Sequence, residues 1–329
     1  MMATMPGAAV CGLGIDAGGT RTRWALAEIT GEIFASGQVA GMTALQMSHV
    51  AGRDQLKESL SALAKAVIAA RQPQFVCAGI TGFDGNPTEL TAIIAASLGI
   101  AAGGVMVRSD IEIACLDLYA PGEGYVVYAG TGSIAAFIDD IGTLHRAGGR
   151  GAILDDAGGG FWIACEALRH IWRNEDERPE SWQTSPMACA IFEHIGGHEW
   201  AQSRRFLYGS TAVDARGTIG RLALAVAAVA DQDPVAQRIL VAAGNELARL
   251  GRAITLRFGT RPMVLTGRVA QLHPIIEQAM RAALPSSTTL TVCVSQAHVA
   301  AARIAAKAAG RTAAPGLQIN QPPSYKEIS

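Results

Sequence analysis

The sequence lacks a charge excess of either sign. Its 27 lysines and arginines are balanced by 28 aspartates and glutamates, for a formal net charge of −1 at pH 7. Nucleic-acid-binding proteins usually carry a basic excess, so we expect no nucleic-acid partner. Hydrophobic residues make up 50% of the 329 positions, which supports a large core, and this length favours two domains.

Long hydrophobic runs are also missing. No apolar stretch reaches the ~18 residues that a membrane-spanning helix needs. The first residues carry no basic region of the kind that opens a signal peptide. We therefore expect a cytoplasmic protein without a membrane partner. The six cysteines form no Cys-x-x-Cys pair, and we expect them to be buried and reduced.

Several familiar catalytic motifs are absent as well. The chain has no Gly-x-x-x-x-Gly-Lys-Ser/Thr loop, no Gly-x-Ser-x-Gly elbow and no His-Glu-x-x-His pair. Gly12 and Gly14 do not follow a strand, so a dinucleotide-binding fingerprint fits poorly.

The sequence does contain a glycine-rich turn near its N-terminus. Apolar residues 8–15 run into Asp16, and residues 18–20 (Gly-Gly-Thr) lead to an alternating segment at 22–28. This order predicts a β-hairpin. Glycines let a phosphate approach backbone N–H groups, Thr20 adds a hydroxyl donor, and Asp16 could hold Mg²⁺ directly or through water. The alternative is an ordinary hairpin with a Gly-Gly turn.

Hydrophobic periodicity predicts alternating strands and helices after this hairpin. The expected strands are at 32–36, 74–80 and 104–107, and the expected helices are at 48–71, 88–98 and 109–118. Ser109 and Glu112 form a capping box at the start of the last of these helices.

The pattern then restarts. An apolar segment at 125–129, a Gly/Thr turn at 130–133 and a second segment at 134–138 repeat the strand–turn–strand order of the N-terminus. This coarse duplication predicts two similar halves, each with its own glycine hairpin. Two such hairpins facing each other across a cleft would grip both ends of a polyphosphate, which strengthens the phosphate interpretation.

The remainder of the chain is expected to be largely helical. The stretch 173–210 is polar and poorly periodic, and we interpret it as an insertion. Beyond it we expect helices at 217–230, 233–257 and up to 284, strands at 262–265 and 288–294, an Ala-rich helix at 297–309, and a loosely ordered tail from residue 311.

Two carboxylates are expected at the ends of strands. Asp16 ends the first strand, and Asp110 follows the strand at 104–107 in the first turn of a helix. A helix N-terminus stabilises a carboxylate, so Asp110 would be ionised and able to accept a proton from an alcohol. The alternative is that Asp110 only stabilises its helix. Ligands of α/β sheets lie at the carboxyl ends of strands, which favours the functional interpretation.

Three further glycine-containing loops are candidate ligand contacts. Residues 148–160 combine glycines with Asp155 and Asp156 directly before a helix, which favours a substrate loop over a flexible turn. Residues 266–268 and 81–82 each follow an expected strand, and glycine there lets a ring or a sugar approach the backbone.

Together these segments resemble the N-acetylglucosamine kinase-like branch of the BadF/BadG/BcrA/BcrD ATPase family, within the superfamily of actin, sugar kinases and heat-shock chaperone ATPases. The resemblance covers about residues 12–300. Its motifs occur in the family's order, at 14–22, 79–82, 108–110, 130–133, 148–151, 156–163 and 266–267.

The resemblance implies an α/β protein of two ribonuclease-H-like lobes, each with a mixed five-stranded sheet, around an interdomain ATP cleft. Residues 1–120 would form the first lobe and residues 121–296 the second. The helix at about 297–310 would pack back on the first lobe, and residues 311–329 would form the tail. ATP and Mg²⁺ are the implied cofactors, a sugar is the implied substrate, and a homodimer is the expected assembly.

The resemblance also implies roles for individual residues. Asp110 would be the base that takes the proton from the sugar 6-hydroxyl, and Asp16 would bind Mg²⁺. The implied phosphate-binding residues are Gly18, Gly19, Thr20, Thr22, Gly130, Thr131, Gly132 and Ser133. The implied adenosine-binding residues are Thr266, Gly267 and Arg268, and those for the sugar are Thr81, Gly82, Asp110, Gly149, Arg150 and Asp156.

Three positions depart from the family pattern on the sugar side. The loop at 41–46 lacks the Asn that commonly holds the sugar, Arg150 replaces a Trp, and Ala157 stands where a Glu is typical. The ATP side therefore matches better than the sugar side. The acceptor could be N-acetylglucosamine, glucosamine or another sugar, and Arg150 would suit an acidic one.

These observations favour an ATP-dependent amino-sugar kinase. The alternative from the same family is an ATP-switched activator without kinase activity, which needs cysteines to hold an iron–sulfur cluster between two subunits. Here Ser133, not a cysteine, follows the second glycine turn. A third alternative, a sugar-sensing regulator, would need a DNA-binding segment before the first strand.

Overall fold

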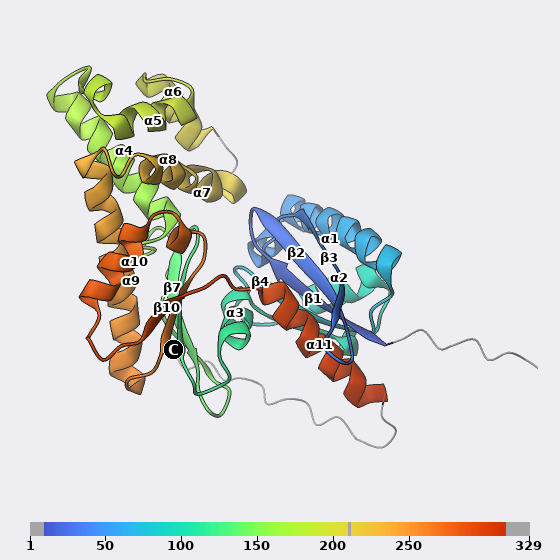
Figure 1. Cartoon of the computed structure of the whole chain (residues 1–329). Coiled ribbons are helices and arrows are strands. Elements are labelled where there is room, and N and C mark those ends of the chain that lie inside the picture. Colours follow the sequence, from blue (N-terminus) through green and yellow to red (C-terminus); the bar gives the residue numbers. More distant parts are fainter. Residues whose placement is uncertain (1–9, 210–211, 314–329) are drawn as a thin grey trace, which may run out of the picture. The chain divides into compact units, whose positions relative to one another are not determined.

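The computed structural model describes residues 10–209 and 212–313. These residues divide into two compact units, one formed by 10–117 together with 296–313 and the other by 118–295 (Figure 1). The C-terminal helix thus belongs to the first unit by its contacts. Among the described residues, no helix is long and apolar enough to cross a membrane.

The first unit is built on a mixed five-stranded sheet, as expected. Its strands are β1 (Cys11–Ala17), β2 (Arg21–Glu28), β3 (Ile33–Ala40), β4 (Phe75–Ile80) and β5 (Val105–Ser109). They lie in the order β3-β2-β1-β4-β5, with β1, β2 and β3 antiparallel and β4 and β5 parallel to β1. This order confirms the ribonuclease-H-like topology and brings the carboxyl ends of β1, β4 and β5 to one edge.

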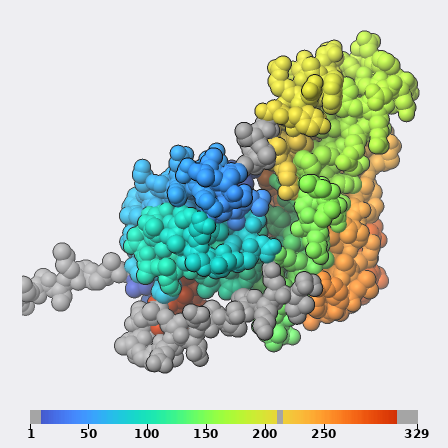
Figure 2. All heavy atoms as spheres, turned by 180° about the vertical axis from the view of Figure 1, so that it is seen from behind, coloured from blue at the N-terminus to red at the C-terminus, as the bar shows by residue number. Residues whose placement is uncertain are grey.

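Helices cover both faces of this sheet. The apolar side chains of α1 (Val50–Ala70) and α2 (Thr88–Leu98) pack on one face, and these helices form the blue-to-cyan surface in Figure 2. The other face carries α3 (Asp110–Leu118) and α11 (Ala297–Ala313). Two short 3₁₀ helices, η1 (Ala44–Ser48) and η2 (Ala102–Gly104), complete the unit.

α11 lies unusually close to β1. A Cβ atom on Gly12 would lie 2.1 Å from the backbone nitrogen of Ala306, and one on Gly14 would lie 2.1 Å from that of Ala302. The helix presents alanines on this side, so backbone packs almost directly on backbone. Glycine in β1 and alanine in α11 together make this approach possible. The tail expected from residue 311 is helical up to Ala313, and its remainder lies outside the described residues.

The second unit repeats the topology of the first. Its strands are β6 (Tyr125–Ala129), β7 (Ser133–Ile138), β8 (Leu144–Gly148), β9 (Met263–Thr266) and β10 (Leu290–Val292). β6, β7 and β8 are antiparallel, β9 and β10 are parallel to β6, and the order is β10-β9-β6-β7-β8. The duplication expected from the two glycine turns is therefore present at the level of the whole sheet.

The helices of the second unit mostly follow the sequence expectations. They are α4 (Gly160–Glu177), α5 (Pro186–Ile195), α6 (Trp200–Tyr208), α7 (Ala212–Gly220), α8 (Leu222–Ala228), α9 (Pro234–Phe258) and α10 (Pro274–Ala283), with η3 (Ser181–Thr184) and η4 (Val269–Gln271). The expected insertion at 173–210 holds the end of α4 and then α5 and α6. The helix expected at 217–230 is divided at Arg221 between α7 and α8.

Asp233 joins the start of α9 to the start of α5. Its Oδ1 accepts the N–H groups of Val235 at 2.8 Å and Ala236 at 3.2 Å, which caps α9. Its Oδ2 accepts the N–H of Met187 at 2.9 Å and the hydroxyl of Ser185 at 3.1 Å. Burial opposes ionisation of this carboxyl, but the hydrogen bonds outweigh it and lower its pKa.

We expect Asp233→Ala to reduce the free energy of unfolding by ~2 kcal/mol or more, because it removes a helix cap and leaves buried donors unpaired. Since the pKa of Asp233 is lowered on folding, its charge stabilises the fold above the ordinary carboxyl pKa. That contribution is lost as the pH falls through the folded-state value. Urea unfolding of the wild type, Asp233→Ala and Asp233→Asn at neutral and acid pH measures this.

The Asn variant is the matched control, because its side-chain oxygen can still cap α9 while it carries no charge. We expect it to lose less stability than the Ala variant at neutral pH, and its difference from the wild type to shrink below about pH 4. An Ala variant within about 0.5 kcal/mol of the wild type would contradict the assigned role of Asp233.

Candidate functional site

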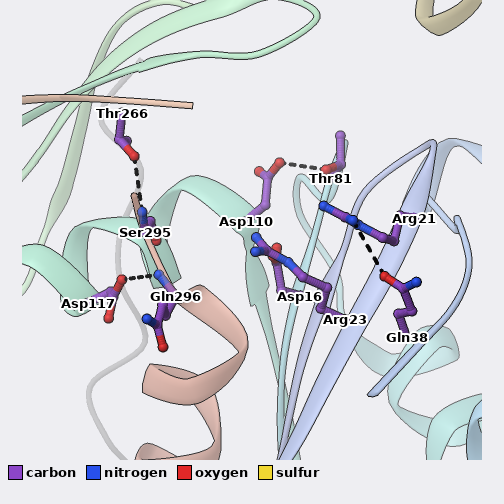
Figure 3. A network of polar contacts seen from close by, with 10 residues as sticks. All are labelled: Asp16, Arg21, Arg23, Gln38, Thr81, Asp110, Asp117, Thr266, Ser295 and Gln296. Carbon is purple, nitrogen blue, oxygen red and sulfur yellow. Dashed lines mark hydrogen bonds and ion pairs between the residues drawn. The ribbon is translucent and has the colours of Figure 1, made fainter. Parts of the chain in front are cut away.

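Several candidate catalytic and ligand-binding side chains lie at one edge of the first sheet. Asp16 lies at the end of β1, Thr81 directly follows β4, and Asp110 directly follows β5 (Figure 3). Because these three strands are parallel, their carboxyl ends meet, which is where ligands of α/β sheets bind. The first unit therefore brings together three of the residues singled out in the sequence.

Asp110 is held by hydrogen bonds on both of its carboxylate oxygens. Thr81 Oγ1 donates to Oδ2 at 2.6 Å, and the backbone N–H of Ile111 donates to Oδ1 at 2.8 Å. The expected capping box at this helix start is only half formed. Ser109 accepts the N–H of Glu112 at 3.4 Å, whereas the Glu112 carboxylate pairs with Arg108.

Asp16 forms an ion pair with its cross-strand neighbour Arg23. Arg23 Nη2 and Nε lie 2.7 and 3.2 Å from the same oxygen, Oδ2, of Asp16. The Asp16 side chain is 19% exposed. Two residues earlier on β2, Arg21 reaches Gln38 on β3 at 3.4 Å. Arg23 belongs to no sequence motif with an expected role, although the hairpin register alone places it opposite Asp16.

A magnesium ion fits this donor set in one way only. Mg²⁺ keeps several waters and is commonly bound by one or two carboxylates plus substrate phosphates. Among the described residues no group of three or more His, Cys, Asp or Glu side chains could hold a metal. Asp16 offers a single carboxylate, so the ion would be bound mainly by phosphate and water.

His298, at the start of α11, is a neighbour that the sequence did not reveal. Its Nδ1 is buried and has no hydrogen-bond partner among the described residues. Burial is the main cause that lowers the pKa of this imidazole, and the positive charge of Arg23 adds to it. His298 is therefore neutral at pH 7 beside the Asp16–Arg23 pair.

The first glycine hairpin has an open tip on a fixed base. The N–H of Gly18 donates to the carbonyl of Arg21 at 3.2 Å, and the carbonyl of Gly18 accepts the N–H of Met42 at 3.1 Å. Gly19 and Thr20 are exposed at the tip. The side chain of Thr22 is fully buried, so its hydroxyl does not reach the surface of the hairpin.

The turn of the second glycine hairpin, at residues 130–133, is hydrogen-bonded to the start of α4. The first-turn N–H groups of Gly160 and Phe161 donate to the carbonyls of Gly130 and Thr131, both at 2.9 Å. The Ser133 hydroxyl donates to the carbonyl of Ala157 at 2.6 Å. These helix N–H groups and this hydroxyl thus hold the hairpin in place, and a phosphate would have to use the turn itself.

The loop after β8 packs against the same hairpin. Asp156 is 6% exposed, and a Cβ on Gly132 would lie 2.5 Å from its Oδ2. Burial raises the pKa of Asp156, while its ion-pair partner Arg216 from α7 acts in the opposite direction. Asp155 pairs with Arg249 at 2.8 Å. Arg150, by contrast, is exposed on this loop.

The predicted adenosine segment also adjoins the second hairpin. The backbone N–H of Ser295 donates to the buried hydroxyl of Thr266 at 3.2 Å (Figure 3). Gly267 has φ +100°, and a Cβ there would lie 2.3 Å from the carbonyl oxygen of Ala129. Glycine is therefore required at this position by the backbone alone. Arg268 is exposed.

The predicted residues thus form two groups, one in each unit. The first unit contains Asp16, Gly18, Gly19, Thr20, Thr81, Gly82 and Asp110 around one sheet edge, and also Thr22, whose side chain is buried. The second contains Gly130, Thr131, Gly132, Ser133, Gly149, Arg150, Asp156, Thr266, Gly267 and Arg268. Each group has the secondary-structure setting that its sequence motif predicted.

Comparison with known proteins identifies the relatives of this chain. The sequence profile of the BadF/BadG/BcrA/BcrD ATPase family matches residues 13–306. An N-acetylmuramic acid/N-acetylglucosamine kinase of Clostridium acetobutylicum is 30% identical over 176 residues, which is 51% of this chain and 55% of the relative. An N-acetyl-D-glucosamine kinase of Dictyostelium discoideum is 25% identical over 185 residues, 50% of this chain and 55% of the relative. The matches therefore span just over half the length of these curated relatives.

A solved structure shares the fold over nearly its full length. A Chromobacterium violaceum protein assigned as an N-acetylglucosamine kinase superposes with a TM-score of 0.69 at 22% identity, covering 91% of this chain and 98% of that one. At this identity the likeness establishes the fold alone.

Proposed function

Since the chain belongs to the BadF/BadG/BcrA/BcrD ATPase family, we propose that it is an ATP-dependent kinase of N-acetylglucosamine, glucosamine or a related amino sugar. The observation that carries this proposal is the edge of the first sheet. There a carboxylate at a helix start, Asp110, shares one strand edge with the glycine hairpin at 18–20 and with Asp16. A proton acceptor and a phosphate-binding turn on one edge are what transfer of a phosphoryl group to a hydroxyl requires.

In this proposal each group has one task. Asp110 accepts the proton of the sugar 6-hydroxyl as that oxygen attacks the γ-phosphorus. The glycine turns at 18–20 and 130–133 donate backbone N–H groups to the phosphates. Mg²⁺, held by Asp16 directly or through water, would neutralise charge on the phosphate oxygens. Residues 266–268 would lie against the adenosine.

Water must be excluded from such a reaction, because ATP would otherwise be hydrolysed without an acceptor. Movement of lobes around a bound nucleotide is the usual means in kinases, and we propose it here. We also propose a homodimer in the cytoplasm.

The acceptor specificity is proposed to depend on Arg150. This residue is exposed on the glycine loop and replaces the Trp typical of the family. A guanidinium is suited to bind a carboxylate. The name of the Clostridium relative includes N-acetylmuramic acid, a sugar that carries a carboxylate. We therefore propose that an acidic amino sugar is among the acceptors.

A coupled ADP-release assay with a panel of acceptors tests the function. We would offer glucosamine, N-acetylglucosamine, N-acetylmannosamine, glucose and N-acetylmuramic acid to the wild type and to Arg150→Trp. We expect acceptor-dependent ADP release, and we expect the Trp variant to lose ~10-fold in kcat/KM for the acidic sugar relative to N-acetylglucosamine. An unchanged preference would refute the role of Arg150.

The same assay separates the kinase from the activator alternative. An ATP-switched activator would release ADP at one rate whatever sugar is present. Ser133 occupies the position where that alternative needs a cysteine, and its hydroxyl is already bonded to Ala157. Sugar-independent ADP release from the wild type would overturn the kinase proposal.

A further inference from the structure

We propose that Thr81 is a positioning residue of the phosphoryl transfer, whose hydroxyl fixes the Asp110 carboxylate in one orientation and favours its ionised form. This inference rests on the proposed function, because it assigns Asp110 the role of proton acceptor. The sequence placed Thr81 among the sugar contacts instead, through its position beside Gly82.

The hydrogen bond to Asp110 is short and specific. Thr81 Oγ1 lies 2.6 Å from Oδ2 of Asp110, while Oδ1 accepts the N–H of Ile111 at 2.8 Å. One donor on each oxygen fixes the plane of the carboxylate. In Figure 3 the two side chains point toward each other from the ends of neighbouring strands. The hydroxyl of Thr81 is thus committed to the carboxylate.

The backbone of Thr81 is fixed on two sides, which keeps this hydroxyl in place. Its N–H donates to the carbonyl of Ala17 at 2.9 Å, at the entry to the first glycine hairpin. Its carbonyl accepts the N–H of Ala44 at 3.0 Å, at the start of η1. A Cβ on Gly18 would lie 4.0 Å from Thr81 Oγ1, so the hydroxyl is also a neighbour of the hairpin.

Thr81 therefore connects three parts of the candidate site. It links the proton acceptor to the strand that carries Asp16 and to the loop at 41–46, where the family commonly has its sugar-binding Asn. The hydroxyl makes the bond to Asp110, and the backbone of Thr81 makes the other two. A small displacement of Asp110 relative to the phosphate hairpin would misalign the attacking hydroxyl, and misalignment of this kind is costly in rate.

The chemistry explains why the donor matters. During transfer, the acceptor oxygen forms a bond to the γ-phosphorus, the bond from that phosphorus to the bridging oxygen breaks, and the hydroxyl proton moves to Asp110. Asp110 must be ionised beforehand to accept this proton. A hydroxyl that donates to a carboxylate stabilises its ionised form. Without it, ionisation requires a higher pH and the carboxylate is free to rotate.

The test compares Thr81→Val, which removes the donor at nearly constant shape, with Thr81→Ser, which keeps the donor. Both are assayed from about pH 5 to about pH 9 in the coupled ADP-release assay. For the Val variant we expect kcat to fall ~10-fold or more at neutral pH and the acid limb of the profile to move up by roughly one pH unit, with KM for sugar changed less than ~2-fold. The Ser variant is expected to restore both.

A double variant shows whether Thr81 acts through Asp110. If it does, Thr81→Val adds no further loss in an Asp110→Asn background, because the group it positions is already gone. Should the Val variant fail to fold, as judged by circular dichroism, Thr81→Ala takes its place in every comparison.

The outcomes are distinguishable from failure of the proposed function. A wild type without sugar-dependent ADP release overturns the kinase proposal itself. An active wild type whose Val variant shows an unmoved acid limb, or a change in KM alone, overturns the positioning role and returns Thr81 to the sugar contacts. Equal losses in the Val and Ser variants would overturn it as well.

Discussion

Asp110→Asn is expected to lower kcat by at least ~10²-fold while leaving the affinity for ATP nearly unchanged. The amide has the shape of the carboxylate and can still accept the N–H of Ile111, so the start of α3 should keep its structure. It cannot accept the proton of the attacking hydroxyl. Since nucleotide contacts are proposed to come from the glycine turns, the loss should fall on the chemical step.

Steady-state kinetics with the best acceptor, together with nucleotide binding measured by calorimetry, checks this prediction. Asp54→Asn on α1 is the matched control, because Asp54 is an exposed carboxylate on the opposite face of the sheet from α3. We expect the control to keep wild-type turnover. Near-normal turnover of Asp110→Asn would remove Asp110 from the role of base, whatever the acceptor.

The course of the chain through the first sheet could be predicted from local patterns. Strands β1, β2, β4 and β5 are short apolar or alternating runs bounded by glycine or polar residues, and α1 has leucines at helical spacing. Such patterns depend on burial of one face, which a sequence displays directly. The repeat of the strand–turn–strand order at the second glycine turn then predicted a second sheet similar to the first.

Strand β8 is an element that hydrophobic periodicity did not predict. No strand was expected directly after the segment at 134–138, yet Leu144–Gly148 pairs with β7 at the edge of the sheet. Every residue of β8 is only partly buried, and His145 and Arg146 interrupt its apolar character. An edge strand is stabilised by pairing with its neighbour rather than by its own burial, so its sequence carries little signal.

The candidate site was predictable in part for a similar reason. Asp16, Asp110 and the glycine turns are local motifs, and their positions at strand ends follow from the strand predictions. The side chains that pair with these residues were harder to predict. The pairing of Arg23 with Asp16 follows from the hairpin register. Arg216, by contrast, is 60 residues away from its partner Asp156 in the sequence. His298 lies near Asp16 only because the C-terminal helix packs on the first sheet. Contacts of that kind depend on the tertiary fold.

Gly12 and Gly14 have a structural reason that the sequence did not show. They were excluded from a dinucleotide-binding role because they do not follow a strand, and no other role was assigned. In the structure they make room for α11 against β1. The close approach of α11, rather than any ligand, explains why these two glycines occur in a buried strand, where glycine is otherwise unfavourable.

Gly14→Ala is therefore expected to destabilise the first unit by ~3 kcal/mol or more, at the upper end of what overpacking costs. The added methyl would lie 2.1 Å from both the nitrogen of Ala302 and the carbonyl oxygen of His298. These are backbone atoms of a helix, so no side chain can turn away to relieve the clash. α11 would have to move off the sheet, and the alanine contacts around Ala302 would be lost with it.

Thermal and urea unfolding, read together with hydrogen exchange of β1 amides, measures this effect. Gly103→Ala is the control, since Gly103 is exposed and a Cβ there meets nothing within 4 Å. We expect the control to stay within about 0.5 kcal/mol of the wild type. If Gly14→Ala were equally stable, α11 could not lie where the structure has it. Because His298, in the first turn of α11, lies next to Asp16 and Arg23, a displaced helix should also weaken the proposed Mg²⁺-dependent nucleotide binding, and the two losses should appear together.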